Sequence, residues 1–297
     1  MKTLKDLGIK AALSSVLTIL TVFAALSVLL FAGCAENLPT SDETGKLSEE
    51  SEAKGDSVAK TYKKYFTLSF DDGTTEDEKM IELLKKYGIK ASFCINTGLM
   101  DGNDVIEVAG SWKRMSFDYA KENKVYEGFD VISHGYRHKE LTFLSDDEII
   151  SEIKNDSEKI RELTGFSPVG FAYPGGTAYY NGYITDVLSS STGVRFARDT
   201  NDTFSFYLPE NFMAWSPTCS ILDNKLFSVA EKFINAEATE DMLFYVWDHP
   251  WAITAYNAWD KVEKLFKMLA ERDDIVFVSN TEFYDLFSAD IPSEPVL

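Results

Sequence analysis

Short apolar runs alternate with single helical patterns along most of the chain, and this alternation constrains the fold more than any other feature. Each run has the length of a buried strand and is followed by apolar residues at helical spacing. Strands connected by single helices pair in parallel through right-handed crossovers. The predicted strands span residues 66–70, 91–95, 129–133, 169–173, 194–198, 212–216 (the weakest), 243–247 and 275–279. Seven or eight such units predict an α/β fold, a closed or nearly closed (β/α) barrel of parallel strands rather than an open sheet.

Two of the predicted helices also have readable ends. A hydroxyl residue followed three positions later by glutamate predicts a capping box, and a glycine after the last turn predicts a helix end. The capping-box pairs are Thr75 with Glu78 and Ser145 with Glu148, and the terminal glycines are Gly88 and Gly165.

The amino terminus has the pattern of an export segment. Three lysines precede an uncharged apolar run at residues 11–31, and the small residues Ala32 and Gly33 come directly before Cys34. The run is also long enough to span a bilayer, so its length does not distinguish a cleaved signal from a retained anchor. The stretch resembles a bacterial lipoprotein signal, although Phe31 replaces the usual leucine. The resemblance implies lipidation of Cys34, a membrane anchor and a location outside the cytoplasm.

The chain therefore divides into a lipoprotein-type signal segment at 1–34, a tether at 35–62 and a barrel domain at 63–297. The tether is rich in Ser, Glu, Thr, Lys and Gly, and it lacks the apolar surface that folding requires, so we expect it to be disordered. The formal net charge of −19 argues against nucleic acid as a partner, because phosphate backbones are also negative. Cys94 and Cys219 are too few for a disulfide scaffold, and we expect two buried thiols.

Unusual polar residues follow the predicted strands. Asp71 and Asp72 follow the first strand, His134 and His138 the third, and His249 the strand at 243–247. The chain has only 3 histidines, and all of them lie in these stretches. Parallel barrels build active sites from the loops at the carboxyl ends of their strands. We therefore expect these five side chains to share one site.

The residue types in this set are those of a catalytic metal site. Two histidines with the spacing HxxxH and one carboxylate give three protein ligands and leave coordination positions open for water and substrate. Adjacent residues at the end of a strand point in different directions. One of the paired aspartates can therefore bind the metal while its neighbour remains free as a base.

Four motifs in this order resemble the NodB-type polysaccharide deacetylases, carbohydrate esterase family four. They are "SFDDG", "HGYRH", "FAYPGG" and "WDHP". The resemblance implies a distorted α/β barrel that removes acetyl groups from N-acetylated sugars of a polysaccharide with a divalent metal, commonly zinc. It also implies Asp72, His134 and His138 as metal ligands, Asp71 as general base and His249 as general acid.

The chain departs from the family pattern at several positions. Ala172 stands where the family usually has an arginine; Arg198 at the next strand end is predicted either to supply that charge to Asp71 or to form a surface salt bridge. Gly175 replaces a common tyrosine, and a backbone amide near it is expected to stabilise the oxyanion. No acidic partner of the catalytic histidine is evident. The candidates are Asp199, Asp223 and Asp248.

Aromatic residues near the strand ends can stack on sugar rings or pack within the barrel, and the sequence does not separate these two roles. This group comprises Trp215, Trp247, Trp251, Tyr179 and Tyr180. The predicted substrate-binding residues are Tyr173, Pro174, Trp215 and Trp251.

Two other functions fit the same residues. Two histidines and one carboxylate also describe the iron site of some oxygenases, although the additional Asp71 and His249 favour hydrolysis. Alternatively, the protein is a lipid-anchored carbohydrate-binding protein with an inactive barrel, an interpretation that Ala172 supports. The polymer itself is not defined by the sequence.

Overall fold

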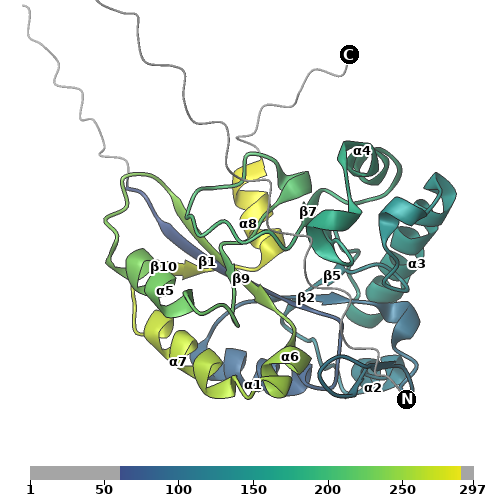
Figure 1. Ribbon diagram of the computed structural model, residues 1–297, viewed down its shortest axis with the longest axis horizontal. Helices are drawn as coiled ribbons and strands as arrows, with labels where there is room; N and C mark the ends of the chain where they lie inside the picture. The colour runs from purple at the N-terminus through teal and green to yellow at the C-terminus, as the bar shows by residue number, and fades with distance from the viewer. Residues whose placement is uncertain (1–60, 289–297) are drawn as a thin grey trace, which may run out of the picture. The chain divides into compact units, whose positions relative to one another are not determined.

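The computed structural model describes residues 61–288 (Figure 1). The predicted signal segment 1–34, its Cys34 and all but the last two residues of the predicted tether 35–62 lie outside the described residues. Within 61–288, no helix has both the length and the apolar character needed to cross a membrane.

The described chain forms one eight-stranded sheet in which every pairing is parallel, as the alternation of strands and helices predicted. Its order is β7-β6-β5-β2-β1-β9-β8, and β10 pairs with β1 as well. The strands are β1 (Lys64–Asp71), β2 (Ser92–Ile95), β5 (Asp130–Ser133), β6 (Gly170–Ala172), β7 (Phe196–Arg198), β8 (Cys219–Ser220), β9 (Met242–Asp248) and β10 (Ile275–Phe277).

Strand β1 lies at the centre of this sheet. It pairs with β9 over nearly its whole length, while β10 pairs with its first half and β2 with its second half. All of its residues are buried. Phe66, Leu68 and Phe70 contribute to the main apolar core, whereas the intervening side chains point to the opposite face of the sheet. Asp71 continues this second series and therefore points into the interior of the barrel at its carboxyl end.

The segment after β7 brings the two edges of the sheet together. The predicted strand 212–216 is wrong: Phe212–Ala214 forms a 3₁₀ turn, and only Trp215 pairs with Arg198 of β7. Two residues later Pro217, which has no N–H to donate, interrupts further pairing with β7. The chain then pairs with β9 as β8, which the sequence did not predict. The same short segment therefore pairs with β7 at one end of the strand order and with β9 near the other end, which closes the distorted barrel that the sequence predicted.

The helices are α1 (Asp77–Tyr87), α2 (Phe117–Glu122), α3 (Asp146–Thr164), α4 (Gly182–Ser191), α5 (Leu226–Asn235), α6 (Pro250–Ala255), α7 (Trp259–Ala270) and α8 (Asn280–Phe287). In Figure 1, α5, α7 and α1 follow one another along the same side of the sheet. Their buried residues Met80, Leu84, Phe233, Leu265 and Phe266 form the main core with the apolar series of β1.

The predicted ends of α3 and the end of α1 are confirmed. Ser145 forms a capping box, and Gly88 and Gly165 end their helices in the left-handed conformation. The capping box at Thr75 is wrong, because α1 begins later and Glu76 precedes it without a side-chain cap. The backbone N–H of Thr75 instead donates to the carbonyl oxygen of Lys113 at 3.0 Å.

Lys113 belongs to an antiparallel hairpin that the sequence did not predict, formed by β3 (Val105–Ile106) and β4 (Trp112–Lys113). An isolated antiparallel bridge joins Thr74 to Arg114, directly after β4. The hairpin is thereby attached to the loop that follows β1.

Candidate metal centre

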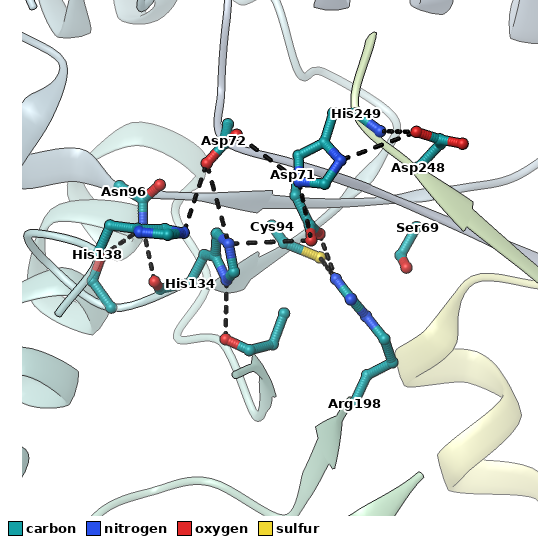
Figure 2. A network of polar contacts seen from close by, with 12 residues as sticks. Ser69, Asp71, Asp72, Cys94, Asn96, His134, His138, Arg198, Asp248 and His249 are labelled. Atoms are coloured by element: carbon teal, nitrogen blue, oxygen red, sulfur yellow. Dashed lines mark hydrogen bonds and ion pairs between the residues drawn. The ribbon is translucent and has the colours of Figure 1, made fainter. Parts of the chain in front are cut away.

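The paired aspartates at the end of β1 have different orientations, as Figure 2 shows. Asp71 is the last residue of β1, and Asp72 leaves the strand with φ of 87°. This left-handed backbone conformation is unfavourable for a residue with a Cβ, and such strain is concentrated at functional sites. Both side chains are almost fully buried, at 2% and 7% exposure. The turn of the backbone directs the Asp72 carboxylate towards the two histidines that follow β5.

His134 and His138 come from the loop after β5, and their ring centroids are 4.7 Å apart. His134 Nδ1 lies 2.8 Å from the carbonyl oxygen of Ala172. A carbonyl only accepts, so Nδ1 carries the proton and Nε2 presents its lone pair to the site. His138 has a positive φ of 53°, so two of the three predicted ligands have unfavourable backbone conformations.

The three predicted metal ligands lie together. Asp72 Oδ1 is 3.9 Å from His134 Nε2 and 3.8 Å from His138 Nε2, and the three ligand atoms are all within 4.8 Å of one another. Burial lowers the pKa of His134 to about 4 and also lowers that of His138, despite the neighbouring carboxylates. Both imidazoles are therefore neutral near pH 7, which is the protonation state that binds a cation. The donor types, spacing and protonation fit a divalent metal ion.

Asp71 is paired with Arg198, which is fully buried and donates from Nη2 to Asp71 Oδ1. Burial by itself would raise the pKa of Asp71, but the Arg198 guanidinium, His134 and His249 together lower it. Asp71 is therefore ionised and able to accept a proton. Of the two interpretations of Arg198, the structure favours the pairing with Asp71 over the surface salt bridge.

His249 lies on the other side of the aspartates (Figure 2). Its Nε2 is 3.9 Å from Asp71 Oδ2 and 3.8 Å from Asp72 Oδ2, and its Nδ1 is 3.8 Å from Asp248 Oδ1. Burial would lower the pKa of His249, but Asp248, Asp72 and Asp71 raise it to about 9. The imidazole is consequently protonated near neutral pH and able to donate a proton.

Of the three candidate acidic partners of His249, Asp248 is the one beside its ring. Asp199 accepts hydrogen bonds from Tyr180 and Ser216 instead. Asp223 accepts from the backbone N–H of Lys225. The adjacency of Asp248 and His249 in the sequence was an available signal, but it did not by itself exclude the other two.

Two predicted substrate-binding residues, Tyr173 and Trp215, are corrected by their burial. Trp215 is 1% exposed and packs against Phe196, Phe212 and other core rings. Tyr173 is also 1% exposed, and its ring stacks on Tyr180. Neither ring has a face on which a sugar can stack.

The other two predicted substrate-binding residues and the predicted oxyanion position lie near the site. Trp251 is buried and its Nε1–H donates to Asp72 Oδ2 at 2.8 Å, so it contacts a predicted metal ligand directly. Pro174 is buried beside Gly135 of the histidine loop. Gly175 is exposed with φ of 71°, and a Cβ there would lie 2.4 Å from the ring of Tyr179. Glycine is therefore required at the position where the oxyanion amide is expected.

Two residues that the sequence analysis missed also surround the site. Asn96 directly follows β2, so the strand-end rule applied to the other residues was sufficient to find it. Arg114 follows the unpredicted hairpin and contacts Asp72. No motif or periodicity in its neighbourhood indicated this contact.

The fold and this cluster define a class of protein: a parallel α/β barrel with a two-histidine, one-carboxylate cation site at its strand ends, beside a second buried carboxylate. The particular family follows from sequence comparison. Residues 59–197 match the polysaccharide deacetylase family. The match covers just under half of the chain and agrees with the resemblance inferred from the motifs. Arg198 and His249 lie beyond the matched segment.

Individual relatives agree with this match. The chain is 30% identical over 120 residues to the peptidoglycan-N-acetylglucosamine deacetylase PgdA of Listeria monocytogenes, covering 40% of this chain and 22% of PgdA. It is 32% identical over 107 residues to a chitin deacetylase of Colletotrichum lindemuthianum, covering 34% and 38% of the two chains. A further match, YlxY of Bacillus subtilis strain 168, is uncharacterised and is covered over 31% of its length. The chain thus spans well under half the length of these relatives.

A solved structure shows the same fold. The Xyl-CE4 domain of a multidomain xylanase from the hindgut metagenome of Trinervitermes trinervoides superposes with a TM-score of 0.50 at 16% identity, covering 79% of this chain and 96% of that domain.

Proposed function

We propose that this protein is a metal-dependent hydrolase that removes acetyl groups from N-acetylated sugars of a cell-wall or extracellular polysaccharide. The observation that carries the proposal is the arrangement of Asp72, His134 and His138 around one point, with the ionised Asp71 and the protonated His249 beside it. The match of residues 59–197 to the polysaccharide deacetylase family and the names of the two deacetylase relatives support the reaction and the polymer class.

Asp72, His134 and His138 would hold the divalent cation, and zinc is the proposed metal because it binds nitrogen and oxygen donors of these types. When bound, such a cation polarises the acetamide carbonyl and makes water a stronger nucleophile at neutral pH. The hydrogen bond from His134 Nδ1 to Ala172 fixes one ring, and Trp251 fixes the second oxygen of Asp72. These contacts orient the donors before a cation arrives.

Asp71 is the proposed general base. Its Oδ2 lies 3.8 Å from His134 Nε2 and 3.9 Å from His249 Nε2, so it faces the point where the reacting water would lie. Arg198 occupies its other oxygen and keeps the carboxylate ionised. Ala172 stands at the position of the family's usual arginine, and Arg198 of another strand supplies the missing charge. This removes the main argument for an inactive barrel.

His249 is the proposed general acid. An amine is a poor leaving group unless it is protonated, and the raised pKa of His249 keeps a proton available near neutral pH. The exposed backbone at Gly175 is the proposed position for an amide that stabilises the oxyanion of the tetrahedral intermediate.

The proposal is tested by acetate release from peptidoglycan, poly-N-acetylglucosamine, chitin oligomers and acetylated xylan, with the purified protein loaded with Zn²⁺ or Co²⁺. Acetate should appear with at least one N-acetylated polymer, stop on chelation and return on addition of the metal. The matched control is Asp71→Asn, which retains the shape of the site and removes the base. If the folded, metal-loaded protein retains glycans without releasing acetate from any of them, it is a binding protein and the proposal is wrong.

We also propose that the protein is anchored outside the cytoplasm through lipid-modified Cys34. The support is the export pattern at 1–34, the small residues before the cysteine and the relation to enzymes whose names include peptidoglycan. Mass spectrometry of the mature amino terminus tests this, and an unmodified Cys34 contradicts it.

A further inference from the structure

The hairpin formed by β3 and β4 attaches the chain segment at Arg114 to the loop after β1. The backbone N–H of Thr75 donates to Lys113 at 3.0 Å, and the N–H of Met115 donates to the carbonyl oxygen of Gly73 at 2.9 Å. Between these two bonds, Thr74 and Arg114 form an antiparallel bridge. The backbone of Arg114 is therefore held against the loop that carries Asp72.

The Arg114 side chain is 5% exposed, and its guanidinium has four polar contacts to three residues. Nη1 donates to the backbone carbonyl oxygen of Asp72 and, at 2.8 Å, to Asn96 Oδ1. Nη2 lies 3.4 Å from Asp72 Oδ1, and Nε donates to Asp104 Oδ2 at 3.0 Å. The rigid fork of arginine suits this simultaneous contact better than any other side chain.

Asn96 continues the connection to the histidine loop. It is fully buried, and its Nδ2 donates to the carbonyl oxygens of His134 at 2.6 Å and Gly135 at 2.8 Å. Figure 2 shows Asn96 next to His138, in the same network of contacts as Asp72 and His134. Arg114 and Asn96, which we call the Arg114–Asn96 bridge, thus connect the backbone of one predicted ligand to the backbone of another.

The Arg114–Asn96 bridge contacts a residue whose backbone conformation is unfavourable. Asp72 has φ of 87°, so its conformation persists only if the surroundings stabilise it. The bond from Arg114 to the carbonyl oxygen of Asp72 supplies that stabilisation on one side. On the other side the backbone N–H of Asp72 donates to Cys94 at 2.9 Å. Without Arg114, the strained backbone of Asp72 loses one of these two bonds, and its carboxylate is held less closely to the histidines although Trp251 still donates to Oδ2.

We propose that Arg114, through Asn96, is a positioning residue that sets the distance between Asp72 and His134 and thereby the affinity of the site for its cation. This inference rests on the proposed function, since it concerns the same cation site. Positioning and charge predict opposite effects on cation binding. A guanidinium beside a ligand carboxylate repels a cation, so removing its charge would strengthen binding. Loss of positioning would instead weaken binding.

The test uses Arg114→Met and Arg114→Lys, with cation affinity measured by titrating the apoprotein with Co²⁺ and recording the visible spectrum of the bound ion. Lysine keeps the buried charge but cannot contact Asp72, Asn96 and Asp104 together. The lysine variant also provides the test if the methionine variant is too unstable to purify. Substituting residues that orient metal ligands typically weakens affinity about 10–100-fold, and we expect both variants to fall in this range with an altered spectrum. Asn96→Ala should weaken binding similarly, and its effect should not add to that of Arg114→Met, because both remove the same bridge.

Lys64→Met is the matched control. Lys64 is also a buried cation. It donates to the carbonyl oxygen of Ile234 at 2.8 Å and pairs with Asp274 at 3.0 Å. It lies at the start of β1, at the opposite end from the site. Its substitution should lower the melting temperature and leave the Co²⁺ affinity and spectrum unchanged.

Folded Arg114 variants with wild-type affinity and spectrum would overturn the inference. Tighter binding by Arg114→Met with unchanged binding by Arg114→Lys would also overturn it, because the residue would then act through its charge alone. These failures leave wild-type metal binding and acetate release intact. A wild-type protein that binds no Co²⁺ would instead overturn the proposed function, and this inference with it.

Discussion

Replacing Asp248 by asparagine should shift the alkaline limb of the pH–activity profile to lower pH. Asp248 Oδ1 lies 3.8 Å from His249 Nδ1, and the carboxylate contributes to the raised pKa of His249, which is about 9. His249 must be protonated to act as the acid, so activity falls as pH rises through its pKa. Removing a negative charge beside an imidazolium lowers that pKa, and the limb therefore moves down rather than up.

The size of the shift follows from the distance. Two unit charges about 4 Å apart interact by about 1 kcal/mol in water and about 4 kcal/mol at an effective dielectric constant of 20. Since 1.36 kcal/mol corresponds to one pKa unit, the limb should move by about 1 to 3 pH units. His249 is 24% exposed, which places the expected value in the lower half of this range. A bound cation neutralises part of the charge of Asp72 in both proteins, so it does not remove the difference between them.

The assay is acetate release from the best substrate between pH 5 and 11, with metal content measured for each sample. Asp223→Asn is the control. The sequence made Asp223 an equal candidate for the acidic partner of His249, but Asp223 accepts from the backbone N–H of Lys225 instead of contacting His249. Its profile should match the wild type. An unchanged alkaline limb in Asp248→Asn, or an equal shift in Asp223→Asn, would refute the assignment of Asp248 and of His249 as the acid.

Three further outcomes are expected. Asp71→Asn should retain the cation and lose activity by about a hundredfold or more, whereas Asp72→Asn should lose the cation itself; metal analysis of both variants checks this, and the reverse result would exchange the two roles. Arg198→Met should raise the pKa of Asp71, because burial then acts without the guanidinium, and the acidic limb of the pH profile should move to higher pH; an unmoved limb contradicts the role of Arg198. His134→Ala should abolish stoichiometric metal binding in an equilibrium dialysis measurement, and normal occupancy in this variant would show that His134 is not a ligand.

The local features of the fold and site were determined by the sequence itself. Seven of the predicted strands exist, because their apolar runs and the intervening helices are signals of neighbouring residues. The alternation of side chains along a strand was enough to predict that Asp71 and Asp72 point in different directions. The HxxxH motif likewise predicted that His134 and His138 bind the same metal, and their ring centroids lie 4.7 Å apart.

Tertiary structure alone decided the contacts between distant segments. Arg198 reaches Asp71 although β7 and β1 are not neighbours in the sheet, because the sheet curls and both side chains point into its interior. The sequence predicted Trp215 and Tyr173 as residues that stack on sugars, but both rings are buried in the core and pack against other side chains. Arg114 contacts Asp72 only because an unpredicted hairpin pairs with the loop after β1. Such contacts depend on which surfaces the folded chain brings together, and no pattern of neighbouring residues encodes that information.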